Sequence, residues 1–339
     1  MKAVVYTAPG ELRLTDVPVP RPAAGEVLVE VGHVGICGSD LLVWEGGLDR
    51  VRPPVVLGHE FCGTVVDANG CGGVRDGQRV AVEPLLNCGR CLACRAGHGH
   101  VCRTLRVIGV DVDGAAARYV TVPAARLHAL PDGVPLRDAA LTEPTSVAVH
   151  MVRRSGVGPG DRVLVLGGGP IGVLVALVAR TNGVADLVVS EPNPRRRERL
   201  AGFGFDTFDP GAGGVETLLG RTDGEGFDVV FEVAGVAATL AAAPELARVR
   251  GTILLGGLPH RPVEAPFATA VMREQHLVGS RVYESRDMAD AVELIASRRI
   301  PVAGLVTREV SLTDAIPDAY EVLRAGRDEL KILVTPGAD

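Results

Sequence analysis

The sequence lacks an uninterrupted apolar segment long enough to span a membrane as a helix. Its longest apolar run, residues 163–179, contains three adjacent glycines and a proline, and it falls short of the ~18–20 residues that a span requires. The N-terminus turns polar too early for the apolar core of a secretory signal peptide. We therefore expect a cytoplasmic protein that does not associate with membranes.

The sequence also lacks a basic excess, and lysine is nearly absent, because Lys2 and Lys331 are the only two. Lysine and arginine together number 35 against 41 aspartates and glutamates, which gives a formal charge of −6. This acidic balance argues against a general nucleic-acid binder. Apolar residues make up 47% of the chain, so global disorder is excluded. The length of 339 residues suggests two domains.

The pattern of apolar residues changes twice along the chain. Before residue 150 the sequence indicates short strands with many glycines and prolines, including an alternating strand at 26–34. From residue 161 strands and helices alternate, which is typical of a parallel sheet covered on both faces. After about residue 276 the pattern is mixed again. We predict an α/β chain in which a doubly wound parallel-sheet domain, residues 150–276, is inserted into a β-rich domain formed by residues 1–149 and 277–339.

A glycine-rich turn lies at the start of the inserted domain. Gly167, Gly169 and Gly172 form a G-x-G-x-x-G pattern, with Pro170 and Ile171 between the last two. The pattern alone is weak in a chain with 43 glycines, but an apolar strand precedes it and an apolar helix follows it. In that context the glycines allow a tight turn, approach of the backbone to a pyrophosphate, and close packing of helix on strand. The alternative is an ordinary strand–turn–helix unit in which the glycines serve packing only.

An acidic residue, Glu191, ends the next expected strand, at the spacing typical of dinucleotide-binding domains. Its carboxylate can accept hydrogen bonds from the adenosine ribose and would repel a 2′-phosphate. Arg195, Arg196 and Arg197 follow closely and could neutralise such a phosphate, or could simply begin a solvated helix. We favour NAD over NADP as the cofactor.

Cysteine is missing from the last two thirds of the chain, and four of the seven cysteines form one close cluster. These four are Cys88, Cys91, Cys94 and Cys102. Four thiolates can close a tetrahedral zinc shell, which indicates a structural zinc site. An iron–sulfur cluster is the alternative, but bacterial ferredoxin runs have a shorter last gap and a following proline. His98 and His100 lie inside the loop and are expected to be bystanders.

A second possible metal site combines Cys37 with the adjacent pair His59 and Glu60. Each residue alone is unremarkable, since a lone cysteine is more often a small buried apolar residue. Together one thiolate, one imidazole and one carboxylate could form an open zinc site that leaves a position for water.

The order of these motifs resembles the zinc-dependent medium-chain dehydrogenases. Members of that family carry a G-[IV]-C-G-[ST]-D segment, a GHE motif, a four-cysteine lobe and a GxGxxG domain, and this chain has all four in that order. Residues 37–47 and 141–150 resemble segments of the polyol (sorbitol-like) and threonine dehydrogenase branch. The resemblance implies a GroES-like catalytic domain and an inserted Rossmann domain.

The resemblance also assigns roles to particular residues. Cys37, His59 and Glu60 match ligands of the catalytic zinc, and Glu143 matches an acid that holds the zinc-bound water or exchanges with it as a ligand. Ser39 matches the hydroxyl that relays the substrate proton. With the four-cysteine site, the chain would hold two zinc ions.

Glu191 and Arg196 match positions that contact the adenosine end of the cofactor. The implied activity is hydride transfer between a secondary alcohol (a polyol, sugar, cyclitol or diol) and NAD(P). Relatives are commonly dimers or tetramers, so a homo-oligomer acting on a small alcohol or ketone is expected.

Three positions depart from the family pattern. Leu42 stands where both relatives have a histidine in the proton path, Val43 stands where sorbitol dehydrogenases tend to have an aromatic residue, and Ser39 stands where threonine dehydrogenases have threonine. Two alternatives to a polyol dehydrogenase therefore remain: a threonine-type amino-alcohol dehydrogenase, and a catalytically inactive, zinc-stabilised binding protein.

Overall fold

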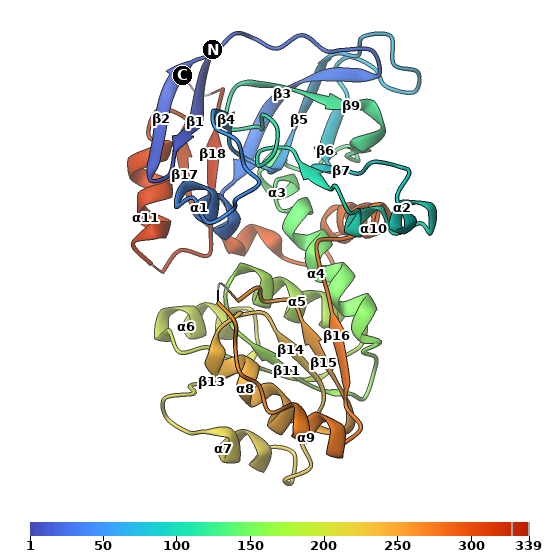
Figure 1. The fold of residues 1–339 in the computed structure, drawn as a ribbon, viewed down its shortest axis with the longest axis vertical. Helices are drawn as coiled ribbons and strands as arrows, with labels where there is room; N and C mark the ends of the chain where they lie inside the picture. Colours follow the sequence, from blue (N-terminus) through green and yellow to red (C-terminus); the bar gives the residue numbers. More distant parts are fainter. Residues whose placement is uncertain (260, 327, 338–339) are drawn as a thin grey trace. The chain divides into compact units, whose positions relative to one another are not determined.

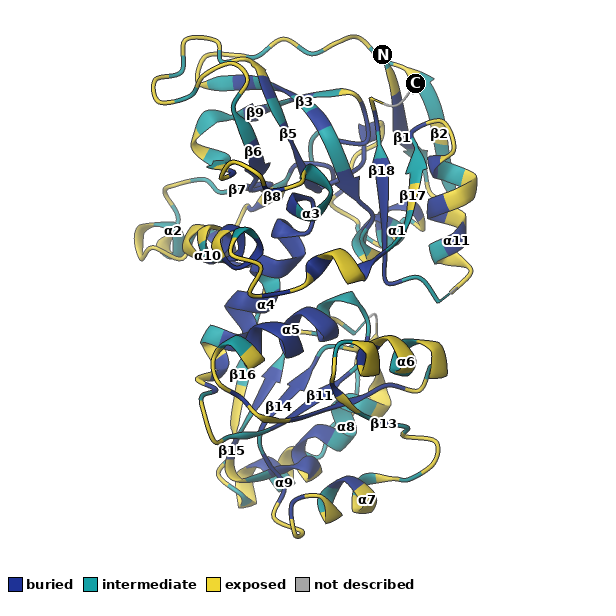
Figure 2. Ribbon diagram, turned by 180° about the vertical axis from the view of Figure 1, so that it is seen from behind, coloured by how far each residue is buried: buried dark blue, intermediate teal, exposed yellow. Residues whose placement is uncertain are grey.

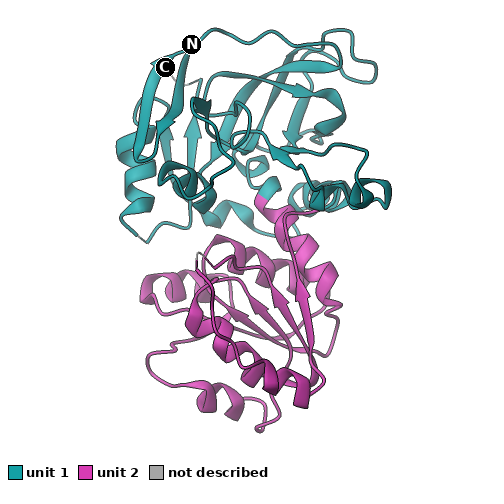
Figure 3. Ribbon diagram, in the orientation of Figure 1, with its two compact units in different colours: residues 1–143, 284–339 teal, residues 144–283 magenta. Residues whose placement is uncertain are grey.

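A computed structural model describes residues 1–259, 261–326 and 328–337. The chain forms two compact units (Figure 3). Unit 1 contains residues 1–143 and 284–339, and unit 2 contains residues 144–283. Among the helices of the described residues, none has the length and apolar character needed to cross a membrane.

The divisions between the units differ by a few residues from those expected from the sequence. They lie at 143/144 and 283/284 rather than at 149/150 and 276/277. The first division falls near the start of helix α4, Thr142–Ser155, so most of that helix belongs to unit 2. The second lies after strand β16, His276–Gly279, because β16 pairs with the sheet of unit 2.

The centre of unit 1 is a seven-stranded sheet in the order β10-β6-β5-β3-β18-β17, with β9 also paired to β3. Its strands are β3 Glu26–Gly35, β5 Glu60–Asp67, β6 Arg79–Val82, β9 Tyr119–Pro123, β10 Leu127–Ala129, β17 Val306–Ser311 and β18 Lys331–Thr335. Strands from both ends of the sequence thus lie in one sheet (Figure 1). Strands β5 and β6 are consecutive in the chain and pair antiparallel as a long hairpin.

Smaller elements complete unit 1. A second sheet has the order β2-β1-β4, and β7 pairs with β8. The bounds are β1 Lys2–Ala8, β2 Glu11–Asp16, β4 Val55–Val56, β7 Leu85–Leu86 and β8 Arg106–Val107. The helices are α1 Gly38–Trp44, α2 Leu92–Arg95, η1 Gly99–Val101, η2 Ala124–Arg126, α3 Leu136–Ala139, α10 Ser285–Ala296, η3 Val302–Leu305, η4 Ile316–Tyr320 and α11 Glu321–Arg324.

Unit 2 is a doubly wound α/β fold, as the sequence predicted. Its six parallel strands have the order β13-β12-β11-β14-β15-β16, so the strand order reverses between β11 and β14. The strands besides β16 are β11 Arg162–Leu166, β12 Asp186–Ser190, β13 Asp206–Phe208, β14 Phe227–Glu232 and β15 Ala247–Leu255. The helices besides α4 are α5 Pro170–Thr181, α6 Pro194–Gly202, α7 Val215–Gly220, α8 Ala237–Leu246 and α9 Phe267–Met272.

The burial pattern explains why these segments form a central sheet. Strand β11 is apolar on both faces and almost wholly buried, and helix α5 is buried along most of its length (Figure 2). Helix α5 packs on β11 and β12, whereas α8 packs on β14 and β15. A strand that is covered on both faces must be apolar throughout, which is the continuous apolar pattern found in the sequence.

Candidate active site and metal centres

Strand pairing brings the thiol of Cys37 close to His59 and Glu60. Strand β3 ends at Gly35, Cys37 follows at the N-cap of α1, and Glu60 begins β5. Strands β3 and β5 are antiparallel, with Gly35 opposite Glu60. The ligand atoms of Cys37, His59 and Glu60 consequently lie within 4.8 Å of one another.

Asp40 orients the imidazole of His59. Its Oδ2 accepts a hydrogen bond of 2.8 Å from the backbone N–H of Cys37, and its Oδ1 lies 3.3 Å from His59 Nδ1. Because Asp40 is fully buried and faces Nδ1, the other nitrogen, Nε2, is directed elsewhere. A carboxylate behind a metal-binding imidazole fixes its tautomer and orientation. In the sequence, Asp40 is marked only as the last residue of the G-[IV]-C-G-[ST]-D segment, three residues after Cys37.

The charges around His59 favour a cation at this imidazole. Burial alone would lower the pKa of His59, but the Asp40 carboxylate and, to a smaller extent, the Cys37 thiol raise this pKa well above its usual value. A metal ion bound to the neutral imidazole would take the place of the proton that these anions attract.

The Ser39 hydroxyl lies 3.2 Å from Nε2 of His59, the nitrogen that Asp40 leaves available. A serine hydroxyl near the start of a helix can also serve as its N-cap, but the N-cap residue of α1 is Cys37 and the capping carboxylate belongs to Asp40. Ser39 is therefore not the cap, and its hydroxyl faces the candidate metal site.

Glu60 has a second partner that the sequence did not reveal. Both of its carboxylate oxygens accept hydrogen bonds from Lys331 Nζ, at 2.8 and 2.6 Å, and the same ammonium donates to the backbone oxygen of Ile36 at 3.2 Å. Both side chains are buried. Burial would lower the pKa of Lys331, but the carboxylate of Glu60, the thiol of Cys37 and, to a smaller extent, the carboxylate of Glu143 raise it above its usual value.

Glu143 lies at the start of α4 and is buried. Its carboxylate contributes to the raised pKa of Lys331. Among the residues that the structure describes, the mutually close ligand atoms at this place belong to Cys37, His59 and Glu60, and Glu143 is not one of them. The role of Glu143 as an exchanging ligand stays a prediction.

The four cysteines of the loop converge as expected for one tetrahedral ion. Their sulfur atoms all lie within 4.8 Å of one another. The Sγ–Sγ distances are 3.5 Å for Cys91–Cys94, 3.9 Å for Cys91–Cys102 and 4.0 Å for Cys88–Cys94. A tetrahedron with Zn–S bonds of ~2.3 Å has edges of about 3.8 Å, so the spacing suits zinc.

The electrostatics of the four-cysteine loop also suit a cation. Backbone hydrogen bonds from Arg90 and Cys91 lower the pKa of the Cys88 thiol to about 5. Burial, followed by the neighbouring thiols of Cys91 and Cys102, raises the pKa of Cys94 to about 11. Backbone hydrogen bonds from Arg103 and Cys94 also lower the pKa of the Cys91 thiol. Two thiols are thus favoured as thiolates, while full ionisation of the cluster needs a positive charge at its centre. His98 and His100 do not join this cluster, because their side chains face Glu284.

The glycine-rich turn of unit 2 has the geometry that its sequence predicted. Gly167 follows β11 with φ of +111°, a conformation that favours glycine. Gly169 is the N-cap of α5, and Pro170 and Ile171 begin the helix. A Cβ on Gly172 would collide with the backbone oxygen of Gly167, so helix and turn can pack this closely only with glycine at position 172.

Glu191 lies beside this turn at the end of β12. Its Oε2 accepts a hydrogen bond of 2.8 Å from the Gly168 N–H, and its Oε1 accepts one of 2.8 Å from the Asn193 N–H. Each carboxylate oxygen can accept a further hydrogen bond. The carboxylate therefore both supports the turn and can receive a ribose hydroxyl.

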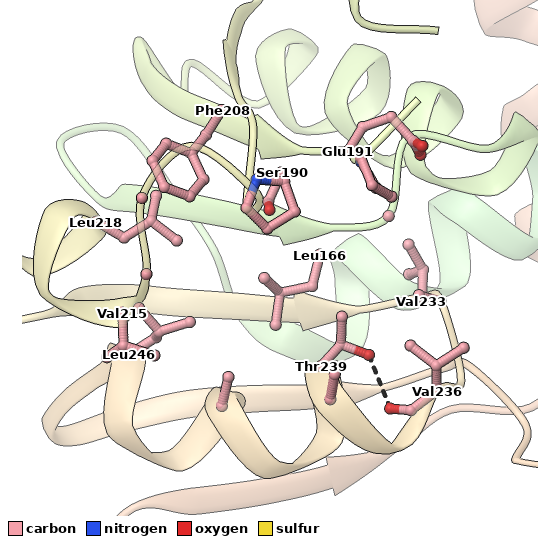
Figure 4. Close-up of a pocket in the computed structure, with 18 of the residues that line it drawn as sticks. Leu166, Ser190, Glu191, Phe208, Val215, Leu218, Val233, Val236, Thr239 and Leu246 are labelled. Carbon is pink, nitrogen blue, oxygen red and sulfur yellow. Dashed lines mark hydrogen bonds between the residues drawn. The ribbon is translucent and has the colours of Figure 1, made fainter. Parts of the chain in front are cut away.

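A cavity of about 670 Å³ opens beside the turn within unit 2. Figure 4 shows apolar side chains around it, among them Leu166, Phe208 and Leu218, with Glu191 at its polar end. Arg196 also lines the cavity, and its buried Nε has no hydrogen-bond partner among the described residues. Arg197 instead pairs with Asp209 at 2.8 Å. An apolar cavity with a carboxylate, a guanidinium and helix amides at one end suits an adenosine diphosphate group.

Comparison with known proteins identifies both parts of the chain. Residues 23–132 match the family model of the alcohol dehydrogenase GroES-like domain, and residues 170–297 match that of the zinc-binding dehydrogenases. A 2-dehydro-3-deoxy-L-galactonate 5-dehydrogenase from Pseudoalteromonas atlantica is 40% identical over the full length of both chains. A sorbitol dehydrogenase from Halalkalibacterium halodurans is 33% identical over 99% of each chain.

The fold has a near match among solved structures. A zinc-binding dehydrogenase from Sinorhizobium meliloti, described as bound to NADP, superimposes with a TM-score of 0.93 at 35% identity and covers 99% of each chain. These comparisons give no support to a catalytically inactive binding protein.

The buried pair of Glu60 and Lys331 generates a prediction about stability. With no metal ion bound at Cys37 and His59, we expect Lys331→Met to reduce the free energy of unfolding by about 3–5 kcal/mol, because it leaves the carboxylate of Glu60 buried without a counter-charge. The double variant Glu60→Gln/Lys331→Met should regain most of that loss, since neither charge is then buried. Denaturant unfolding of the single and double variants measures the coupling. If the losses of unfolding free energy in the two single variants simply added in the double variant, the pairing of Glu60 with Lys331 would be contradicted.

Proposed function

Since the chain belongs to the zinc-dependent medium-chain dehydrogenases, in the branch of polyol and threonine dehydrogenases, we propose that its substrate is a secondary alcohol of a polyol, sugar acid or diol. The chain is an alcohol oxidoreductase. The observation that carries the proposed chemistry is the convergence of Cys37, His59 and Glu60, with the Ser39 hydroxyl on the same imidazole.

We assign two zinc ions to the chain, both held by residues of unit 1. Cys37, His59 and Glu60 would hold the catalytic ion, with Glu143 as the group that exchanges with water or with Glu60. Cys88, Cys91, Cys94 and Cys102 would hold the structural ion. When bound, the catalytic zinc supplies a Lewis acid that polarises an alcohol or carbonyl oxygen, and the nicotinamide supplies the hydride acceptor or donor.

Within this scheme the protein residues bind, orient and move a proton. Asp40 lies against Nδ1 of His59 and orients the ring, so Nε2 would be the nitrogen that binds the ion. Ser39 removes the proton from the substrate hydroxyl and passes it outward. Leu42 cannot accept that proton, so the next carrier is water or a ribose hydroxyl of the cofactor.

For the cofactor we propose NAD, with its ribose bound by Glu191 and its adenosine edge by Arg196. A carboxylate at this position receives the ribose hydroxyls and repels a 2′-phosphate. The zinc-binding dehydrogenase from Sinorhizobium meliloti is described as bound to NADP, which argues against a preference for NAD in this chain. The group that could bind a 2′-phosphate is Nε of Arg196, which has no hydrogen-bond partner among the described residues.

We further propose a homo-oligomer, a dimer or a tetramer, that uses the edge of the sheet in unit 2. Strand β16 is the last strand of that sheet, and unpaired edges invite pairing with another chain. Large apolar side chains are exposed nearby in sequence, with Phe267 59%, Val271 73% and Met272 84% exposed. We place the protein in the cytoplasm, because clustered metal-binding thiols need a reducing compartment.

The substrate class is tested by a panel of alcohols read by NADH absorbance. The panel should contain sorbitol, xylitol, 2,3-butanediol, threonine and, in the reductive direction, a 2-keto-3-deoxy sugar acid. We expect turnover with a polyol or sugar acid, and none with simple primary alcohols at the same concentration. Turnover with threonine alone would move the assignment to the amino-alcohol alternative.

The two zinc sites should respond differently to substitution. Cys37→Ala should abolish turnover while leaving the fold intact, whereas Cys94→Ser should lower the yield of folded protein, because a structural zinc contributes folding free energy. Metal analysis should give about two zinc ions per chain for the unmodified protein and about one for Cys37→Ala. Cys71→Ala is the matched control, since the thiol of Cys71 lies outside both clusters. Unchanged turnover of Cys37→Ala would refute the catalytic site.

The proton-transfer role of Ser39 predicts a large kinetic effect with little structural change. Ser39→Ala should reduce turnover by roughly 10²–10⁴, the usual contribution of a positioned proton-transfer group. Zinc content, NAD affinity and melting temperature should change little, because Cys37 and Asp40 cap the helix. Near-normal turnover would remove Ser39 from the mechanism.

Glu191 should set the cofactor preference. Glu191→Ala should weaken NAD binding by about 10–100-fold, the effect of losing hydrogen bonds to a charged group. It should also reduce the difference between the dissociation constants of NAD and NADP. Fluorescence titration with the reduced cofactors measures both constants. Arg196→Ala is the companion variant, because it should weaken the binding of NADP more than the binding of NAD. If the unmodified protein binds NADP more tightly than NAD, the assignment of Glu191 as selector is wrong.

A further inference from the structure

A third group of metal-binding side chains lies in unit 1, outside both zinc sites. It consists of His98 and His100, from the four-cysteine loop, and Glu284, from the start of α10. One ligand atom from each residue lies within 4.8 Å of the other two. The loop and the helix are far apart in sequence, but they lie side by side in both views of the ribbon (Figures 1 and 2).

Both imidazoles face the same carboxylate oxygen. His98 Nδ1 lies 3.3 Å and His100 Nδ1 lies 3.9 Å from Glu284 Oε1. The two rings are nearly perpendicular, with an interplanar angle of 88° and centroids 6.1 Å apart. Ligand atoms of a tetrahedral ion with bonds of ~2.0–2.1 Å are about 3.4 Å apart, so these atoms are near the spacing that one ion requires.

The other oxygen of Glu284 is already engaged. Arg286 Nε lies 2.7 Å from Oε2, and the Glu284 backbone N–H donates to Asp287 Oδ2 at 2.8 Å. These contacts fix the carboxylate at the beginning of α10, with Oε1 directed at the imidazoles. Carboxylates that bind metal ions are usually held in place by hydrogen bonds to neighbouring groups, as the Glu284 carboxylate is held here by Arg286 and by the Asp287 N–H.

We propose that His98, His100 and Glu284 form a third, exchangeable zinc site with water in the remaining position. Two imidazoles and one carboxylate are an established donor set for zinc in proteins. Three protein ligands, one of them with a side chain 58% exposed, hold an ion less tightly than the four thiolates nearby. Glu284 is the first residue of unit 1 after the α/β unit, so the ion would tie that point of the chain to the four-cysteine loop.

Zinc binding to the purified protein tests this proposal. The unmodified protein is dialysed against a weak chelator, its remaining zinc is measured, and radioactive zinc is then added in equilibrium dialysis. We expect one further equivalent per chain, and a rise in melting temperature as this equivalent binds. His98→Gln, at an exposed position where folding should be unaffected, should lose the added equivalent and the rise in melting temperature while keeping the zinc retained after dialysis.

His33→Gln is the matched control. His33 also faces a carboxylate, with its Nε2 3.5 Å from Glu309 Oε2, but it belongs to no cluster of metal ligands among the described residues. This variant should bind the added equivalent as the unmodified protein does. The proposal is refuted if no added equivalent binds, if His98→Gln binds it with unchanged affinity, or if both variants lose it equally. None of these outcomes depends on the alcohol dehydrogenase activity, which is measured separately.

Discussion

The buried ion pair between Glu60 and Lys331 joins the two ends of unit 1 at the candidate active site. Lys331 begins β18, Glu60 begins β5, and both strands are neighbours of β3. Burying two charges costs several kcal/mol for each, and replacement of such a pair by apolar residues is often neutral or stabilising. Its presence beside Cys37 and His59 therefore points to a role in the chemistry of the site rather than in folding alone.

The balance of charges around that pair explains why a metal ion suits the site. Asp40, Glu60, Glu143 and the Cys37 thiol can each carry a negative charge, and Lys331 is the buried ammonium among them. Without a metal ion, Lys331 and a protonated His59 supply two positive charges, which cannot neutralise four such groups. A divalent ion bound by Cys37 and His59 would reduce the excess, and Lys331 would then compete with that ion for the carboxylate of Glu60. This competition gives a physical reason why Glu60 and Glu143 could alternate as ligands.

The sequence was sufficient where function depends on local spacing, and insufficient where it depends on pairing between distant strands. The glycines of the turn and the four cysteines could be found because each motif lies within a short segment. Cys37, His59 and Glu60 could be assigned because the order of the motifs along the chain resembles a known family. The partnership of Glu60 with Lys331 spans 271 positions, and that of His98 with Glu284 spans 186. Both depend on which elements lie beside one another. The second domain boundary was displaced for the same reason, since the short strand β16 is recognisable only through its pairing with β15.

The four-cysteine cluster and the proposed histidine site share a loop whose helix α2 is poorly packed. Helix α2 has no buried residue, and Leu92 is 77% exposed, so apolar burial contributes little to holding the loop in place. A metal ion among the four thiolates would supply most of that stability. The positions of His98 and His100 relative to Glu284 depend on the same backbone, because both histidines lie between Cys94 and Cys102. We therefore expect zinc to bind at the proposed histidine site only after the thiolate site is filled, whereas the thiolate site should fill without it.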